Sequence, residues 1–133
     1  MPGGRSIPGS PDEWLDRARG DLALASASLP EGAFYEDLCY HAQQAAEKAL
    51  KAVILKQGLT FRYVHDLDEL IVDLEQGDVQ IPPEVEAAVE LSAYASETRY
   101  PGMSEPVTSQ EYQRAVDMAE EVVQWAESEF QRQ

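Results

Sequence analysis

The side chains best suited to acid–base chemistry are two histidines. His41 and His65 are the only groups whose unperturbed pKa lies near neutrality, so general acid–base catalysis would have to use one of them. His65 stands directly before Asp66, which has the type and position of a helix N-cap. This position favours a structural role for His65, in which its imidazole is hydrogen-bonded across the loop.

A row of polar side chains follows His41 at helical spacing and continues through Gln44, Lys48 and Lys51. Lysine offers a mobile positive charge and glutamine a directional amide, so this row could present donors to a phosphate or to RNA. For the row taken alone we favour the alternative, an ordinary solvated helix face on which Glu47 and Lys51 form an i, i+4 ion pair. The sequence leaves both interpretations open.

Arg99 is the other cation whose position indicates a role. It follows a nearly apolar segment in an acidic part of the chain and stands next to Tyr100, before a loop stiffened by two prolines. It is either the anchor of a bound ligand, together with Tyr100, or the buried partner of an acid such as Glu97. We count both Arg99 and Tyr100 among the predicted ligand-binding residues.

Most motifs that bind metals or phosphates are missing from the sequence. There is no Gly-rich phosphate loop, no paired cysteine, no His-Glu-x-x-His and no Gly-x-Ser-x-Gly. We therefore expect no metal, no cofactor and no catalytic residue of a standard type. The single Cys39 cannot form an internal disulfide and is expected to pack as a small apolar group, in a reducing compartment.

Negative charge is concentrated in the second half of the chain. The formal net charge is −15; seven Lys and Arg oppose nine Asp and Glu up to Asp66, whereas three oppose sixteen from Leu67 onward. Such a surface repels a phosphate backbone over a Debye length of about 8–10 Å, which argues against general nucleic-acid binding. A basic partner fits this field better, although a merely solvated acidic surface explains it too.

The sequence shows neither a signal peptide nor a run of about 20 apolar residues. We therefore expect a cytoplasmic protein without a membrane contact.

These side chains must be positioned by a long helix predicted over residues 35–57, which contains no Gly, Pro or turn signal and would be roughly 34 Å long. Five alanines along it leave little side-chain bulk, so neighbouring helices can approach closely on more than one side. These alanines are Ala42, Ala45, Ala46, Ala49 and Ala52. The pattern is typical of a helix at the centre of a bundle.

Capping signals and apolar periodicity predict four further helices, over residues 10–28, 66–77, 82–97 and 108–130. Between the second and third helices we expect an extended connection that places Phe61 and Tyr63 against the bundle. The fold class is therefore all-α: a five-helix up-and-down antiparallel bundle built around the long central second helix. Residues 10–131 form one domain, and residues 1–9 form a disordered tail.

Met118 and Trp125 lie seven residues apart on the last predicted helix, beside its apolar stripe. A large aromatic side chain next to Met indicates an interface for a partner. Packing against a neighbouring helix is the alternative explanation.

The string HAQQAAEKALKAVILKQG, the later Tyr63-Val64-His65-Asp66-Leu67 and the segment Arg99-Tyr100-Pro101-Gly102 resemble the HEPN domain family. The resemblance covers about residues 14–130. It implies an all-α bundle related to the helical domain of kanamycin nucleotidyltransferase, usually a homodimer that binds nucleotides. It also implies a small nucleotidyltransferase as the partner protein, commonly in a toxin–antitoxin pair.

Many members of this family are metal-independent RNases that use an Arg, four to six intervening residues and then a His. This chain departs from that pattern, because Ser104, Glu105 and Pro106 occupy the positions after Arg99, and neither His41 nor His65 follows an Arg at that spacing. Losing an acid–base group typically removes 10²–10⁴ in rate. The sequence therefore predicts a binding or accessory HEPN protein, and the alternative is an endoribonuclease with an unconventional site at a dimer interface.

Overall fold

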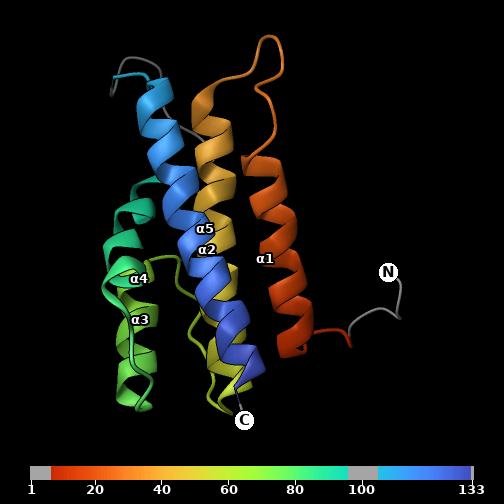
Figure 1. Cartoon of the computed structure of the whole chain (residues 1–133), viewed down its shortest axis with the longest axis vertical. Helices are drawn as coiled ribbons and strands as arrows, with labels where there is room; N and C mark the ends of the chain where they lie inside the picture. The colour runs from red at the N-terminus through yellow and green to blue at the C-terminus, as the bar shows by residue number, and fades with distance from the viewer. Residues whose placement is uncertain (1–6, 96–104, 133) are drawn as a thin grey trace.

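A computed structural model of the chain describes residues 7–95 and 105–132, and its described part is a bundle of helices (Figure 1). The order is α1 (Pro11–Ala25), α2 (Tyr35–Lys56), α3 (Leu67–Gln76), α4 (Pro83–Ala87), the 3₁₀ helix η1 (Ala88–Tyr94) and α5 (Ser109–Gln131). Within these residues no strand occurs. The all-α class predicted from the sequence is confirmed.

The long helix α2 lies at the centre of the arrangement. It contacts α1, α3, η1 and α5. Figure 1 shows α1 running antiparallel to α2, and α4 with η1 running antiparallel to α5. The central position predicted for this helix is therefore correct.

The alanines of α2 explain how four elements fit around one helix. Ala42, Ala45, Ala46, Ala49 and Ala52 all have no exposed surface, and neither has Cys39 one turn before them. A methyl group is the smallest side chain that a helix can present without the backbone cost of glycine, so neighbouring backbones approach α2 closely. Cys39 packs as the small apolar group that the sequence predicted.

Two helices begin at the caps that the sequence indicates. Asp66 Oδ1 accepts from the backbone N–H of Asp68 at 3.1 Å at the start of α3. At α5, Thr108 Oγ1 accepts from Glu111 N–H at 3.0 Å, and Glu111 Oε1 accepts from Thr108 N–H at 2.9 Å. This reciprocal pair satisfies two backbone donors that the helix itself leaves free.

The first helix is shorter than predicted. Ser10 caps its start by accepting from Glu13 N–H at 3.2 Å, but the Glu13 carboxylate accepts from Gly9 N–H at 2.6 Å rather than from that of Ser10, so the two residues do not form a reciprocal capping box. The helix ends at Ala25 instead of residue 28. Serines compete locally for backbone hydrogen bonds and the residue before a proline avoids the α conformation, which favours an early end before Pro30. Residues 1–6 of the predicted tail lie outside the described residues, and residues 7–10 form a turn.

The fourth predicted helix, over residues 82–97, is not one α-helix. A short α4 passes into η1, which ends at Tyr94, and the residues beyond 95 lie outside the described part. Val85, Ala88 and Leu91 are buried at a spacing of three. This spacing matches the three residues per turn of a 3₁₀ helix, so the tighter winding keeps all three on one side.

The connection after α2 runs back along the same helix. It leaves through Gly58, whose φ of +79° suits glycine, and returns until the carbonyl of His65 accepts from Gln43 Nε2 at 3.1 Å. At the start of this connection the N–H of Leu59 donates to the carbonyl of Ile54 at 3.0 Å, and Ile54 lies about 16 Å along the helix from Gln43. This return brings His65 beside the middle of α2.

Only one of the two aromatic residues predicted to pack in this connection does so. Phe61 lies edge-on against Trp14, with ring centroids 5.0 Å apart, whereas Tyr63 is 94% exposed. The N–H of Val64 donates to the carbonyl of Arg62 at 2.9 Å, which makes Tyr63 the centre of a three-residue turn. The turn breaks the alternation of an extended chain and leaves Tyr63 in solvent.

In the described part of the chain, no helix has the length and apolar character that crossing a membrane requires.

Replacing Ala46 with Leu should destabilise the protein by about 1–3 kcal/mol, because added methylene groups have no space in a closely packed interface. The control is Ala23→Leu, the same change at an exposed position of α1. Urea denaturation followed by circular dichroism measures both. Equal stability of the two variants would mean that α2 tolerates bulk, contrary to the packing described.

Candidate functional site

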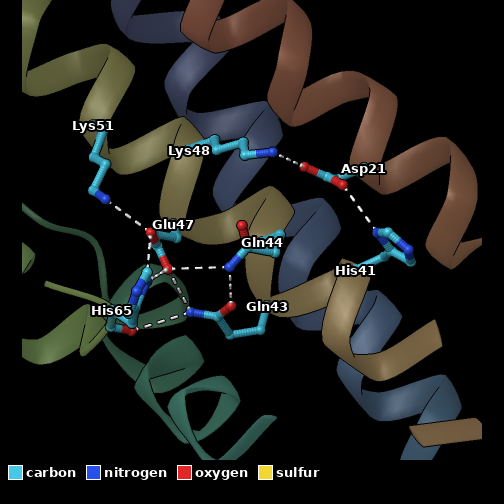
Figure 2. Close-up of polar contacts among 8 residues, drawn as sticks. All are labelled: Asp21, His41, Gln43, Gln44, Glu47, Lys48, Lys51 and His65. Atoms are coloured by element: carbon cyan, nitrogen blue, oxygen red, sulfur yellow. Dashed lines mark hydrogen bonds and ion pairs between the residues drawn. The ribbon is translucent and has the colours of Figure 1, made fainter. Parts of the chain in front are cut away.

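The polar row predicted along α2 is divided into two hydrogen-bonded clusters (Figure 2). One cluster is centred on Asp21 of α1 and holds His41 and Lys48. The other is centred on Glu47 of α2 and holds Gln43, Gln44, Lys51 and His65. The structure thus separates side chains that their helical spacing placed in one row.

Asp21 joins α1 to α2 through both of its carboxylate oxygens. Oδ1 lies 3.0 Å from His41 Nδ1, and Oδ2 accepts from Lys48 Nζ at 2.7 Å. Asp21 is only 8% exposed. Because an ionised carboxylate only accepts hydrogen bonds, Nδ1 of His41 is the donor, and Nε2 is the ring nitrogen left for other partners.

Glu47 is more deeply buried, at 3% exposed, and has four side-chain partners. Its Oε1 accepts from Gln43 Nε2 at 2.9 Å and from Gln44 Nε2 at 3.3 Å, while Oε2 accepts from Lys51 Nζ at 2.8 Å. Nδ1 of His65 lies 3.1 Å from both oxygens. Figure 2 shows His65 approaching Glu47 from the returning connection.

The pKa of Glu47 reflects two opposing effects. Burial alone raises it, but the hydrogen bonds from Lys51, Gln43 and His65 and the charge of Lys51 together outweigh burial. The net pKa lies below the usual value of 4.5. The carboxylate is therefore held in its charged form.

Lys51 is not on an exposed edge. It is 4% exposed, and its Nζ lies 5.0 Å from the ring centroid of Phe61 and 5.7 Å from that of Trp14. Aromatic faces and a carboxylate surround the ammonium group, which is a favourable environment for a buried cation. The interpretation of Glu47–Lys51 as a solvated pair is wrong, because the loop and α1 cover it.

The other predicted site residues have different outcomes. Arg99 and Tyr100 lie outside the described residues. His65 is hydrogen-bonded to a buried acid of α2 rather than across its own loop. Met118 and Trp125 are half-buried and pack against the core, so their role as an interface stays a prediction.

Asp21 and Gln43 are the polar residues that sequence reasoning missed. Asp21 is three residues after Ala18 and four before Ala25, both fully buried, and so occupies the inward stripe of α1. Gln43 stands likewise between Cys39 and Ala46 on α2 and has no exposed surface. A polar residue at an apolar stripe position signals a buried hydrogen-bonded group.

Neither cluster has the donor set of a metal site. Across residues 7–95 and 105–132, no three side chains of His, Cys, Asp or Glu gather as metal ligands would. Together the two clusters hold two imidazoles and two ammonium groups in fixed places. In the Asp21 cluster, 33% of the His41 side chain and 27% of the Lys48 side chain are accessible.

Replacing Lys51 with Met should cost about 3–5 kcal/mol of stability, because it leaves Glu47 buried without its cation. Adding Glu47→Gln to this variant removes the second charge and should recover most of the loss. Arg114→Met, which removes the cation of the exposed Arg114–Glu90 pair, is the control and should cost less than about 1 kcal/mol. Urea denaturation at neutral pH gives the free energy of unfolding of the wild type and of the three variants. If the double variant is as unstable as Lys51→Met, the charge argument is contradicted.

The lowered pKa of Glu47 predicts a pH dependence of stability. A group whose pKa is lower when folded stabilises the native state above its unfolded pKa, near 4.5, and loses this contribution as pH falls through the folded pKa. The free-energy difference between the wild type and Glu47→Gln should therefore shrink below about pH 4.5. Denaturation curves from pH 7 to 3 measure it, and a constant difference would show that Glu47 does not titrate in this way.

Three known proteins are similar to this chain. TT1696 from Thermus thermophilus, a solved crystal structure, is 34% identical with a TM-score of 0.77, and the match covers 90% of this chain and 97% of that one. The crystal structure of ST0689, described as an archaeal HEPN homologue, has 24% identity and a TM-score of 0.71 over 90% of this chain and 96% of its own. The second likeness concerns the fold alone.

A shorter match links the chain to a protein of Methanocaldococcus jannaschii named "Putative toxin MJ1304". The two are 43% identical over 49 residues, which cover 37% of this chain and 32% of that protein. The match therefore spans about a third of that relative. The family model described as HEPN domain matches residues 11–129, and with this extent of agreement the chain belongs to the HEPN domain family.

Proposed function

We propose that this protein is the HEPN component of a toxin–antitoxin-type pair and acts by binding rather than by cutting RNA. Its partner is a small nucleotidyltransferase, and a nucleotide is its small ligand. Membership of the HEPN family and the partial likeness to a protein named as a toxin support the pair. The observation that carries the binding role is the neutralisation of the α2 cations by carboxylates.

This neutralisation lowers the attraction of α2 for phosphate. Asp21 holds Lys48 at 2.7 Å, and Glu47 holds Lys51 at 2.8 Å. A cation that is already paired contributes little net charge to a phosphate backbone at longer range. The sequence also lacks an Arg and a His at the spacing of the family's RNase motif. Both features argue against efficient recruitment and cleavage of RNA.

The acidic half of the chain supports a basic protein partner. From Leu67 onward sixteen acids oppose three basic residues, and the described part of this segment forms α3, α4, η1 and α5. Complementary charge speeds association and selects partners. Within this proposal the chain is a homodimer, as the resemblance implies, and a nucleotide binds through local hydrogen bonds beside the partly exposed His41 and Lys48, without the long-range attraction that a nucleic-acid backbone needs.

A second candidate function is a metal-independent endoribonuclease with an unconventional site at the dimer interface. The Asp21–His41 pair favours it, because a carboxylate on Nδ1 orients an imidazole and leaves Nε2 as a base. In this mechanism His41 would accept a proton from a ribose hydroxyl, and Lys48 would stand beside the developing negative charge.

Co-expression with a nucleotidyltransferase encoded by a neighbouring reading frame tests the proposal. We expect the two proteins to elute together in size-exclusion chromatography at low salt, and the complex to weaken as salt rises, because salt screens surface charges. We also expect the purified chain to leave single-stranded RNA intact in EDTA. The binding role is overturned if the chain cuts RNA in EDTA and His41→Asn lowers that rate by about 10²–10⁴, since this result establishes the second function.

A further inference from the structure

A groove of about 550 Å³ lies between α4 and α5. None of the residues that line it belongs to the two α2 clusters. Ala87 and Met118 contribute apolar surface, and Glu84, Asp117 and Glu121 contribute carboxylates. All of these residues except the half-buried Met118 are exposed. Figure 1 shows α4 beside α5, on the side of α5 opposite to α1.

The charge of this groove is negative and is not balanced from within. Among the described residues that line it, the one cation is Arg114, which donates to both carboxylate oxygens of Glu90, at 2.8 and 3.0 Å. The lining acids Glu84, Asp117 and Glu121 form no ion pair with a described Lys or Arg. An apolar surface bordered by three uncompensated carboxylates attracts a cationic ligand that also carries apolar groups.

A second copy of this chain does not offer the unpaired cations that the groove would attract. Each described Lys or Arg side chain other than Lys56 lies within an ion pair: Arg17, Arg19, Lys48, Lys51, Arg62, Arg114 and Arg132. Lys56 Nζ lies over the ring of Phe130, 5.3 Å from its centroid. A copy would also bring its own net charge of −15 toward the groove. The charge therefore selects a different, basic molecule.

The length of the groove indicates the kind of basic molecule. Along α5 its lining extends from Gln110 to Glu121, about 17 Å of helix. This length matches about three turns of a second helix, and helices pack with their axes about 8–10 Å apart. A helix with apolar side chains on one face and Lys or Arg beside them can contact both kinds of surface.

We propose that the α4–α5 groove is the docking site for a basic amphipathic helix of a partner protein. Apolar side chains of that helix pack against Ala87 and Met118, and its cations pair with Glu84, Asp117 and Glu121. The inference rests on the binding role proposed above and assigns the surface that performs it. Apolar burial supplies most of the affinity, while the carboxylates supply orientation and rate of association.

A labelled model peptide of about 15 residues, with Leu on one helical face and Lys on the other, tests the site with the full chain, using the length set by three to four turns. Its control peptide carries Glu in place of Lys. We expect the fluorescence anisotropy of the Lys peptide to rise when the protein is added, and that of the Glu peptide to stay unchanged. Glu121→Lys should weaken its binding by roughly tenfold or more, because it replaces an attractive pair with a repulsive one.

Two further variants separate the groove from the general acidic field. Glu120→Lys changes the same charge one residue earlier, but residue 120 lines the groove between α1 and α5, so we expect a change of about twofold or less. Ala87→Leu fills the groove without changing charge and should also weaken binding. Equal effects of Glu120→Lys and Glu121→Lys, or no effect of Ala87→Leu, would overturn the proposal. Circular dichroism verifies that each variant is folded.

The same variants distinguish this inference from the proposed function. If the nucleotidyltransferase fails to co-elute while the peptide binding depends on Glu121 and Ala87, the function fails and the docking site stands. If it co-elutes equally with the wild type, Glu121→Lys and Ala87→Leu, the docking site fails and the function stands. If the wild type self-associates in sedimentation velocity and Ala87→Leu does not, the groove binds a second copy of the chain, and the proposal of a basic partner is refuted.

Discussion

The close approach of neighbouring helices to the small side chains of α2 is the constraint on which the rest of the structure depends. Ala45, Ala46 and Ala49 are fully buried, and α2 contacts α1, α3, η1 and α5. Such close contact excludes water from most of the helix and leaves side chains such as His41 and Lys48 only partly accessible. Polar side chains on it must therefore find protein partners, because an unpaired polar group in a dry interface costs more than a lost hydrogen bond.

The two polar clusters are the result of this exclusion. Asp21 joins α1 to α2 through His41 and Lys48, and Glu47 joins α2 to the returning connection through His65. Within the described residues, no buried side-chain nitrogen or oxygen lacks a hydrogen-bond partner. Each cluster favours the observed placement of α1 or of the connection against α2, because moving either segment would separate Asp21 from His41 and Lys48, or His65 from Glu47.

This internal pairing also changes where a partner is expected to bind. In the sequence, Lys48 and Lys51 follow His41 at helical spacing and therefore look like a phosphate-binding row. In the structure they form ion pairs with Asp21 and Glu47. The net charge left for long-range interactions is the negative charge of the segment after Leu67. Among the described residues, the carboxylates of Glu84, Asp117 and Glu121 in the α4–α5 groove form no ion pair, whereas Lys48 and Lys51 of the α2 row are both paired.

The sequence by itself determined the features that depend on neighbours within a few residues. The caps at Asp66 and Thr108 and the alanine-rich character of α2 follow from local hydrogen bonds and side-chain size. Only the tertiary structure decided that Asp21 pairs with Lys48 across 27 positions and that Lys51 is covered by the returning connection. Helical spacing defines the direction of a side chain but not the segment that will cover it, so burial and pairing of the candidate site could not be predicted from the chain alone.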